Sequence, residues 1–106
     1  MKITTSEINK KQKSISVQIE GELVLSNCEK AKKTFLDLLS KHNVFNVKLE
    51  NVEAIDLAFV QLLISFFDTA KNEKKQIKLT KNLTSNIETV LKNTGFNKNI
   101  EKYIES

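Results

Sequence analysis

Two side chains of this sequence, Cys28 and His42, could supply a nucleophile and a general base. They are its only cysteine and its only histidine. A catalytic nucleophile needs a base within hydrogen-bond reach and a third group that orients the base. Cys28 falls in the first turn of an expected helix, where thiolates are stabilised, but with no arginine or histidine near it in sequence we interpret it as a small packed side chain. We interpret His42 as a solvent-exposed loop residue and expect no enzymatic activity.

The sequence also lacks the patterns of metal and nucleotide sites. One histidine and one cysteine cannot complete a zinc site without several carboxylates, and no ligand spacing of that kind is present. Gly21 and Gly95 are the only glycines, so no glycine-rich loop is available to hold a phosphate. We therefore expect neither a metal ion nor a cofactor.

The remaining candidate site is Asp56, where an expected strand meets the most apolar segment of the chain. Apolar residues after it recur at i, i+3, i+4, i+7, i+8 and i+11, which predicts a helix with one buried face. That face consists of Phe59, Leu62, Leu63, Phe66, Phe67 and Ala70. A carboxylate at the start of such a helix accepts hydrogen bonds from free backbone N–H groups. The simplest interpretation of Asp56 is a helix N-cap, and a recognition site is the alternative.

Residues 56–63, Asp-Leu-Ala-Phe-Val-Gln-Leu-Leu, resemble a turn of the STAS domain (sulphate transporter and anti-sigma factor antagonist). That family carries Asp-Ser-[Ser/Thr]-Gly-Leu here, and some branches carry Asp-Thr-Ala-Gly-Leu-Gln-Leu-Leu. Asp56, Ala58 and the Gln-Leu-Leu of 61–63 agree with the second form. Leu57 and Phe59 replace its hydroxyl residue and its glycine. Two further stretches resemble the family, Gly-Glu-Leu at 21–23 and Gly-Phe at 95–96.

The resemblance implies a binding module rather than an enzyme. In anti-sigma factor antagonists a partner kinase phosphorylates the residue two positions after the aspartate, which here is Ala58. The resemblance thus implies a branch that lacks the phosphorylatable Ser or Thr. The partners it implies are an anti-sigma kinase, a chemotaxis or signalling scaffold, or the ATPase of a membrane transporter, and the form with Ala58 and Gln61 is typical of the latter two.

The periodicity of the whole chain predicts the element order β-β-α-β-α-β-α-α. We expect strands at 3–8, 14–20, 44–49 and 76–79, with 21–23 leaving the second strand and 51–54 forming the exit loop of the third. We expect helices from a capping box at Ser26 to Lys41, from Asp56 to about Asn72, from a capping box at Ser85 to Gly95, and over 97–105. The inner faces should carry Ala31, Phe35, Leu38 and Leu39 in the first helix and Ile87, Val90 and Leu91 in the third.

Alternating strands and helices predict parallel strand pairs, and the initial hairpin adds an antiparallel edge. The fold class is therefore α/β, a STAS-like mixed β-sheet with helices packed on it. At 106 residues we expect one domain over 1–106.

The net charge of +4 makes a lysine-driven, non-specific nucleic-acid-binding domain an alternative function. All 17 basic residues are lysine, and without the bidentate fork of arginine sequence-specific binding is disfavoured. A lipid-handling or lipid-transporter-associated STAS subunit is a further alternative. We expect a bacterial protein. We expect it in the cytoplasm, because the N-terminus does not have the pattern of a signal peptide and the single cysteine suits a reducing compartment.

The leading hypothesis is a protein-binding surface at the start of the central helix. Its candidate residues are Ser26, Asp56, Leu57, Ala58, Phe59 and Gln61. Leu57 and Phe59 place apolar bulk where the family has small or hydroxyl residues, and exposed apolar bulk is typical of interfaces. Phe59 also fits the buried stripe, so its place in the core is the alternative.

Overall fold

A computed structural model describes residues 1–95 of the chain, and the elements follow the predicted order. They are β1 (Lys2–Asn9), β2 (Ser14–Leu23), the 3₁₀ helix η1 (Leu25–Asn27), α1 (Cys28–Lys41), β3 (Val44–Ile55), α2 (Leu57–Asn72), β4 (Gln76–Asn82) and α3 (Ser85–Thr94). The helix expected over 97–105, and the packing of Phe96, lie outside the described residues.

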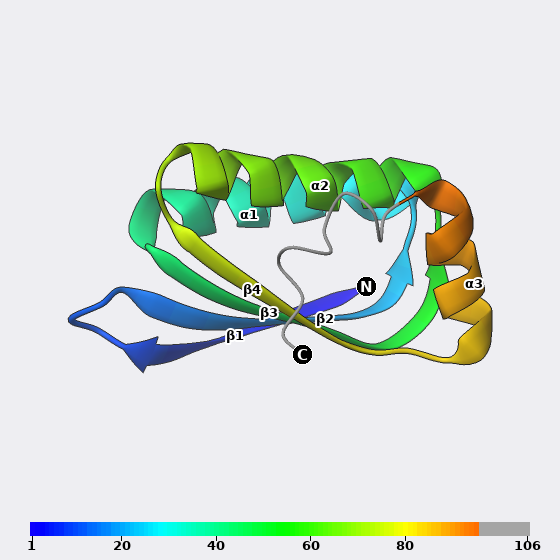
Figure 1. Cartoon of the computed structure of the whole chain (residues 1–106), viewed down its shortest axis with the longest axis horizontal. Coiled ribbons are helices and arrows are strands. Elements are labelled where there is room, and N and C mark those ends of the chain that lie inside the picture. The colour runs from blue at the N-terminus through cyan, green and yellow to red at the C-terminus, as the bar shows by residue number, and fades with distance from the viewer. Residues whose placement is uncertain (96–106) are drawn as a thin grey trace.

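The four strands form one mixed sheet in the order β1-β2-β3-β4. β1 pairs with β2 antiparallel, whereas β2 with β3 and β3 with β4 are parallel. The hairpin and the two helical crossovers thus have the geometry predicted from the sequence. α1 and α2 lie side by side over one face of the sheet, and α3 lies at the end where α2 begins (Figure 1).

The core lies between the sheet and the pair of long helices. The alternation in β2 places Ile15, Val17 and Ile19 inside. The predicted inner face of α1 is confirmed, since Ala31, Phe35, Leu38 and Leu39 are its buried residues. In α2 the buried residues are Phe59, Val60, Leu63, Phe66, Phe67 and Ala70, while Leu62 is half-buried. The rings of Phe35 and Phe66 stack with centroids 4.5 Å apart and join the two helices.

Both predicted capping boxes are wrong. The chain first makes the 3₁₀ turn η1, which contains Ser26, and α1 then begins after Asn27 without a side-chain cap. The Asn27 side chain instead donates to the Glu22 carbonyl at 2.8 Å. In α3 the cap is Thr84, one residue before Ser85, and its hydroxyl accepts from the Ile87 N–H. Ile87 and Leu91 are buried as predicted, but Val90, which was placed on the same inner face, is 37% exposed.

The strands run further than the sequence predicted. β4 continues to Asn82 rather than ending at 79, and β2 and β3 extend through segments that were placed outside them. β2 continues through 21–23, and 51–54 belong to β3 rather than to an exit loop. The pairing explains this, because Ile19 faces Leu49 but Gly21 faces Val52, so two residues of β3 oppose one of β2 in a bulge. Asn51 and Gly21 take positive φ angles of 51° and 90° there. Residues that are typical of turns thus sit at a bulge within the sheet.

Gly95 ends α3 in the left-handed conformation at φ 78°, as predicted. Within residues 1–95 no helix is long and apolar enough to cross a bilayer.

Candidate protein-binding corner

The Asp56 carboxylate joins two loops that are far apart in sequence. Asp56 follows β3 and caps α2, where one carboxylate oxygen accepts from the Phe59 N–H at 3.0 Å. The other oxygen accepts from the Leu25 N–H at 2.8 Å, at the start of η1. The Asp56 N–H donates to the Leu23 carbonyl at 3.1 Å. The predicted N-cap is therefore confirmed, and the same side chain also fixes the loop between β2 and α1.

Two leucines project into solvent beside this carboxylate. Five large apolar side chains are exposed among the described residues, and two of them lie beside Asp56. Leu57, 52% exposed, follows Asp56 in the chain, and Leu25, 69% exposed, donates its backbone N–H to the carboxylate. Leu57 is the first residue of α2 and Leu25 the first of η1. We call the surface formed by Leu25, Ser26, Asp56, Leu57, Ala58 and Gln61 the Asp56 corner.

Most of the predicted site residues are accessible at this corner. Ser26, Leu57 and Gln61 are exposed, and Asp56 and Ala58 are half-buried. Phe59 is different, because it is 0% exposed and belongs to the core cluster. As the third residue of α2 it turns inward under the helix, so its place among surface contact residues was wrong and the core alternative is correct.

Leu25 was missed by the sequence analysis. It lies between the end of β2 and the start of α1 and belongs to no periodic pattern. The one indication in the sequence was that Leu25 is a large apolar residue that fits no helical or strand periodicity, two positions after the Gly-Glu-Leu at 21–23. Its distance of 31 residues from Asp56 hid the hydrogen bond that joins them.

The side chains that could have supplied nucleophilic chemistry are kept apart. Cys28 begins α1 and His42 follows its end, so about 20 Å of helix separates them at 1.5 Å per residue. Burial raises the pKa of the Cys28 thiol, and the nearby Asp56 carboxylate raises it further. The thiol therefore stays protonated and packs against the core, which favours the packing interpretation.

His42 caps α1 instead of lying free in a loop. Its backbone N–H donates to the Leu38 carbonyl at 3.0 Å, and its ring nitrogen lies 3.3 Å from the same oxygen. The half-buried ring packs edge-on to Phe45, with centroids 6.4 Å apart. Among the described residues, no three His, Cys, Asp or Glu side chains are arranged to hold a metal ion.

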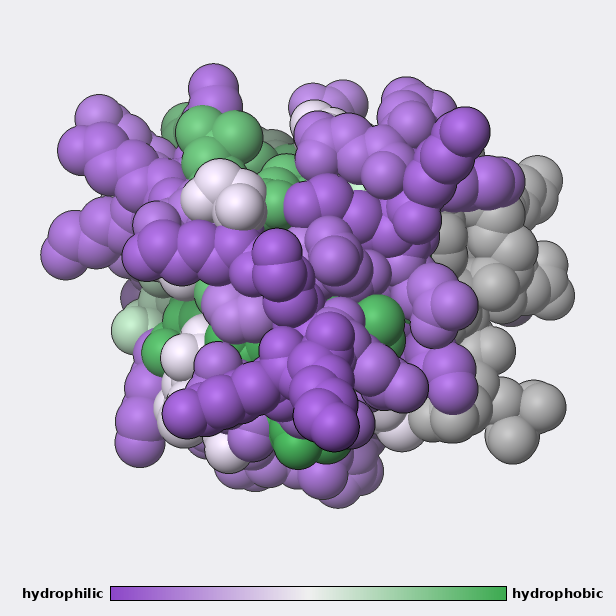
Figure 2. Space-filling view, turned by 90° about the vertical axis from the view of Figure 1, so that its left-hand side faces the viewer, coloured by the Kyte–Doolittle hydropathy of each residue, from purple (hydrophilic) through white to green (hydrophobic). Residues whose placement is uncertain are grey.

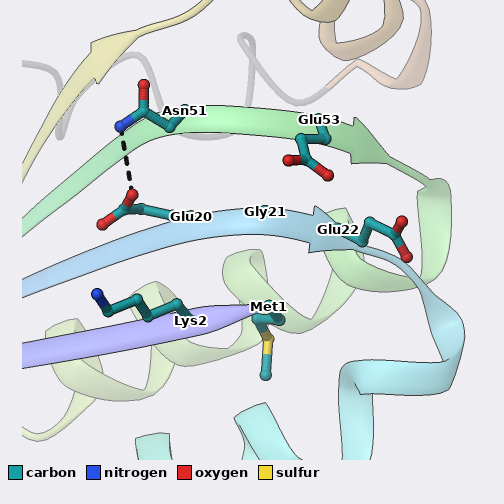
Figure 3. Close-up of a pocket in the computed structure, with 7 residues that line it drawn as sticks. All are labelled: Met1, Lys2, Glu20, Gly21, Glu22, Asn51 and Glu53. Carbon is teal, nitrogen blue, oxygen red and sulfur yellow. Dashed lines mark hydrogen bonds between the residues drawn. The ribbon is translucent and has the colours of Figure 1, made fainter.

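A polar hollow of about 390 Å³ lies beside the bulge, near the ends of β2 and β3. It is lined by Met1, Lys2, Glu20, Gly21, Glu22, Asn51 and Glu53, and their side chains do not converge on one point (Figure 3). The Glu20 carboxylate is engaged by Asn51 at 3.2 Å and by Gln18 at 2.7 Å. This charged, open lining does not suit a lipid chain.

Comparison with protein families matches residues 6–103 to the family described as "Mlab, STAS domain". No curated protein matches the chain.

Solved structures also match. The anti-sigma factor antagonist SpoIIAA in its unphosphorylated form has 11% identity and a TM-score of 0.73, over 98% of this chain and 86% of that one. The Bacillus cell fate determinant SpoIIAA in its phosphorylated form has 11% identity and a TM-score of 0.71, over 98% and 89%. SLC26A9 has 11% identity and a TM-score of 0.71, over 88% of this chain but 18% of its own. At this identity the likeness concerns the fold, and in SLC26A9 it is confined to a small part of a much longer protein.

Proposed function

The chain belongs to the STAS domain family, and from that premise we propose that it is a non-enzymatic module whose protein partner docks on the Asp56 corner. The observation that carries the proposal is the pair of exposed leucines, Leu25 and Leu57, on backbone that the Asp56 carboxylate holds from both sides. This is an apolar surface that is already ordered before a partner arrives.

The energetics support docking at this place. Full burial of an exposed leucine side chain contributes about 1.5–3 kcal/mol, so two leucines supply a useful centre for an interface. Because η1 and the first turn of α2 are fixed by hydrogen bonds, little ordering entropy is lost on binding. Both Asp56 oxygens already accept hydrogen bonds, so the partner need not satisfy a free carboxylate.

Ala58 removes the phosphorylation switch at its own position. A phosphate at this position would add about two negative charges to the interface, but Ala58 has no hydroxyl to carry one. SpoIIAA, by contrast, has been solved in a phosphorylated form. We therefore propose a constitutive partner, of the signalling-scaffold or transporter-ATPase kind rather than a kinase that modifies the corner, in the bacterial cytoplasm.

The test is affinity capture from the native cell with three tagged proteins: wild type, Leu57→Asp and Leu36→Asp. Leu36 is a matched control, since it is 56% exposed on α1 and lies outside the corner. We expect a protein that co-purifies with wild type and with the Leu36 variant but is lost with the Leu57 variant. All three should give the same circular dichroism spectrum, because both leucines are exposed.

Salt separates this function from the nucleic-acid alternative. An apolar interface keeps its occupancy as salt rises, whereas lysine-driven binding to nucleic acid falls steeply. Capture by the Leu57 variant at the wild-type level, or a captured species that is nucleic acid and is released by salt, would refute the proposed corner.

A further inference from the structure

We propose that the end of the molecule opposite the Asp56 corner docks on an anionic lipid bilayer. This surface, here called the lysine end, is made by three segments: the hairpin 8–13, the end of α1 at 37–42, and the turn 71–75 between α2 and β4. The lysines look dispersed in the sequence, but the fold brings seven of them together: Lys10, Lys11, Lys13, Lys41, Lys71, Lys74 and Lys75.

Hydrogen bonds join the three segments into one surface. The Lys13 carbonyl accepts from the Asn43 N–H at 2.9 Å, and the Asn43 carbonyl accepts from the Gln76 N–H at 2.9 Å. The Lys75 ammonium donates to the His42 carbonyl at 2.9 Å and to the Leu39 carbonyl, so it caps α1 from the neighbouring turn. In Figure 1 the hairpin, the end of α1 and the start of β4 all lie at the left of the molecule.

The charge of the chain is concentrated at this end. The three segments hold seven lysines against two acidic residues, Asp37 and Glu73, an excess of five, whereas the whole chain carries +4. Counting the adjacent Glu7 and Asp68 as well still leaves an excess of three. At the other end the hollow by the bulge is lined by three glutamates, Glu20, Glu22 and Glu53 (Figure 3). The excess of positive charge is therefore specific to the lysine end.

Several of these lysines are available for an external partner. Lys10, Lys11, Lys13 and Lys74 are exposed and make no ion pair with any of residues 1–95. Lys41 pairs with Asp37 on the surface, and Lys75 is held inside. Docking on a negative surface would thus require few existing contacts to be broken.

An exposed isoleucine favours a bilayer over nucleic acid as the partner. Ile8 is 56% exposed in the same hairpin as Lys10, Lys11 and Lys13. An aliphatic side chain beside several lysines can enter the headgroup region while the ammonium groups meet anionic lipid, but it gains nothing from a phosphodiester backbone. Figure 2 views the molecule from this end, where long polar side chains dominate and small apolar areas show between them.

Docking in this way leaves the proposed protein partner free to bind. β3 runs between the two ends, from Val44 beside the Lys13 carbonyl to Ile55 beside Asp56. The longest dimension of the molecule is 39 Å and lies along this direction in Figure 1. A chain held by its lysine end would present the Asp56 corner away from the membrane.

The test is co-sedimentation of the full chain with phosphatidylcholine vesicles, with and without a third of phosphatidylglycerol. The test variant changes Lys10, Lys11 and Lys13 to Gln, and its control changes Lys30, Lys33 and Lys92 to Gln, which removes the same charge from exposed positions elsewhere. A second variant, Ile8→Ser, keeps the charge. We expect binding to the anionic vesicles alone, with about a fivefold loss of partitioning per lysine removed from the lysine end.

The control variant should bind the vesicles within about twofold of wild type, since the exposed lysines it alters lie outside the lysine end. Ile8→Ser should weaken vesicle binding severalfold but leave any binding to duplex DNA unchanged. Absence of binding to the anionic vesicles would overturn the proposal. So would equal losses in the two triple variants, or a preference for duplex DNA over vesicles at equal salt.

Discussion

Asp56 illustrates how one structural side chain can also position the proposed recognition surface. Its carboxylate accepts one hydrogen bond from the start of α2 and one from the start of η1. The residue that marks the family turn is therefore a structural link between two loops in this chain. It fixes the two leucines beside it.

Replacement of Asp56 by Ala should lower the free energy of unfolding by about 2 kcal/mol, because a helix cap contributes about 1 kcal/mol and a second hydrogen bond to the charged carboxylate about as much again. Urea unfolding followed by circular dichroism measures this. Asp37→Ala is the control, since it removes only an exposed ion pair with Lys41 and should cost less than about 0.5 kcal/mol. Equal losses in the two variants would show that the Asp56 bonds do not hold the corner.

The elements of the fold could be predicted where the periodicity was long. The alternation of β2 and the stripe of α2 needed no tertiary information, and the buried positions of α1 were predicted one by one. The ends of elements could not be predicted in the same way. Asn51 and Gly21 are typical of turns, yet here they lie at a bulge that only the pairing of β2 with β3 reveals. Capping was misplaced at Ser26 because a 3₁₀ turn intervenes.

The two glycines offer a prediction at the scale of the elements. Both have positive φ, 90° at Gly21 and 78° at Gly95, so alanine is strained at either position by about 1 kcal/mol. At Gly21 an added Cβ would also lie 3.2 Å from the Met1 Cα, whereas at Gly95 it would meet nothing within 4 Å. Gly21→Ala should therefore be the more destabilising variant in thermal unfolding, and it should also loosen β1 at the edge of the sheet.

Amide hydrogen exchange would identify that loosening, because the amides of β1 should exchange faster in the Gly21 variant than in the Gly95 variant. If Gly95→Ala were instead the more destabilising, the close approach of β1 to the bulge would not matter for stability.

At the scale of the whole molecule, the chain places two different surfaces at its two ends. The lysine end could not be predicted from the sequence, and the Asp56 corner could be predicted only in part, because each is assembled by tertiary contacts. Leu25 meets Asp56 across 31 residues, and Asn43 joins the end of the hairpin at Lys13 to the start of β4 at Gln76 through backbone hydrogen bonds. The roles of Asp56, Leu57 and Ala58 could be predicted from their residue types, but their neighbours in space are determined by the parallel topology of the sheet.

Hydrogen–deuterium exchange on the complex with the captured partner tests the central claim most directly. Binding at the Asp56 corner predicts slower exchange at the amides of 25–28 and 57–61, with the hairpin 8–13 unchanged. Slower exchange confined to the hairpin or to the strands, with 25–28 and 57–61 unaffected, would contradict the account.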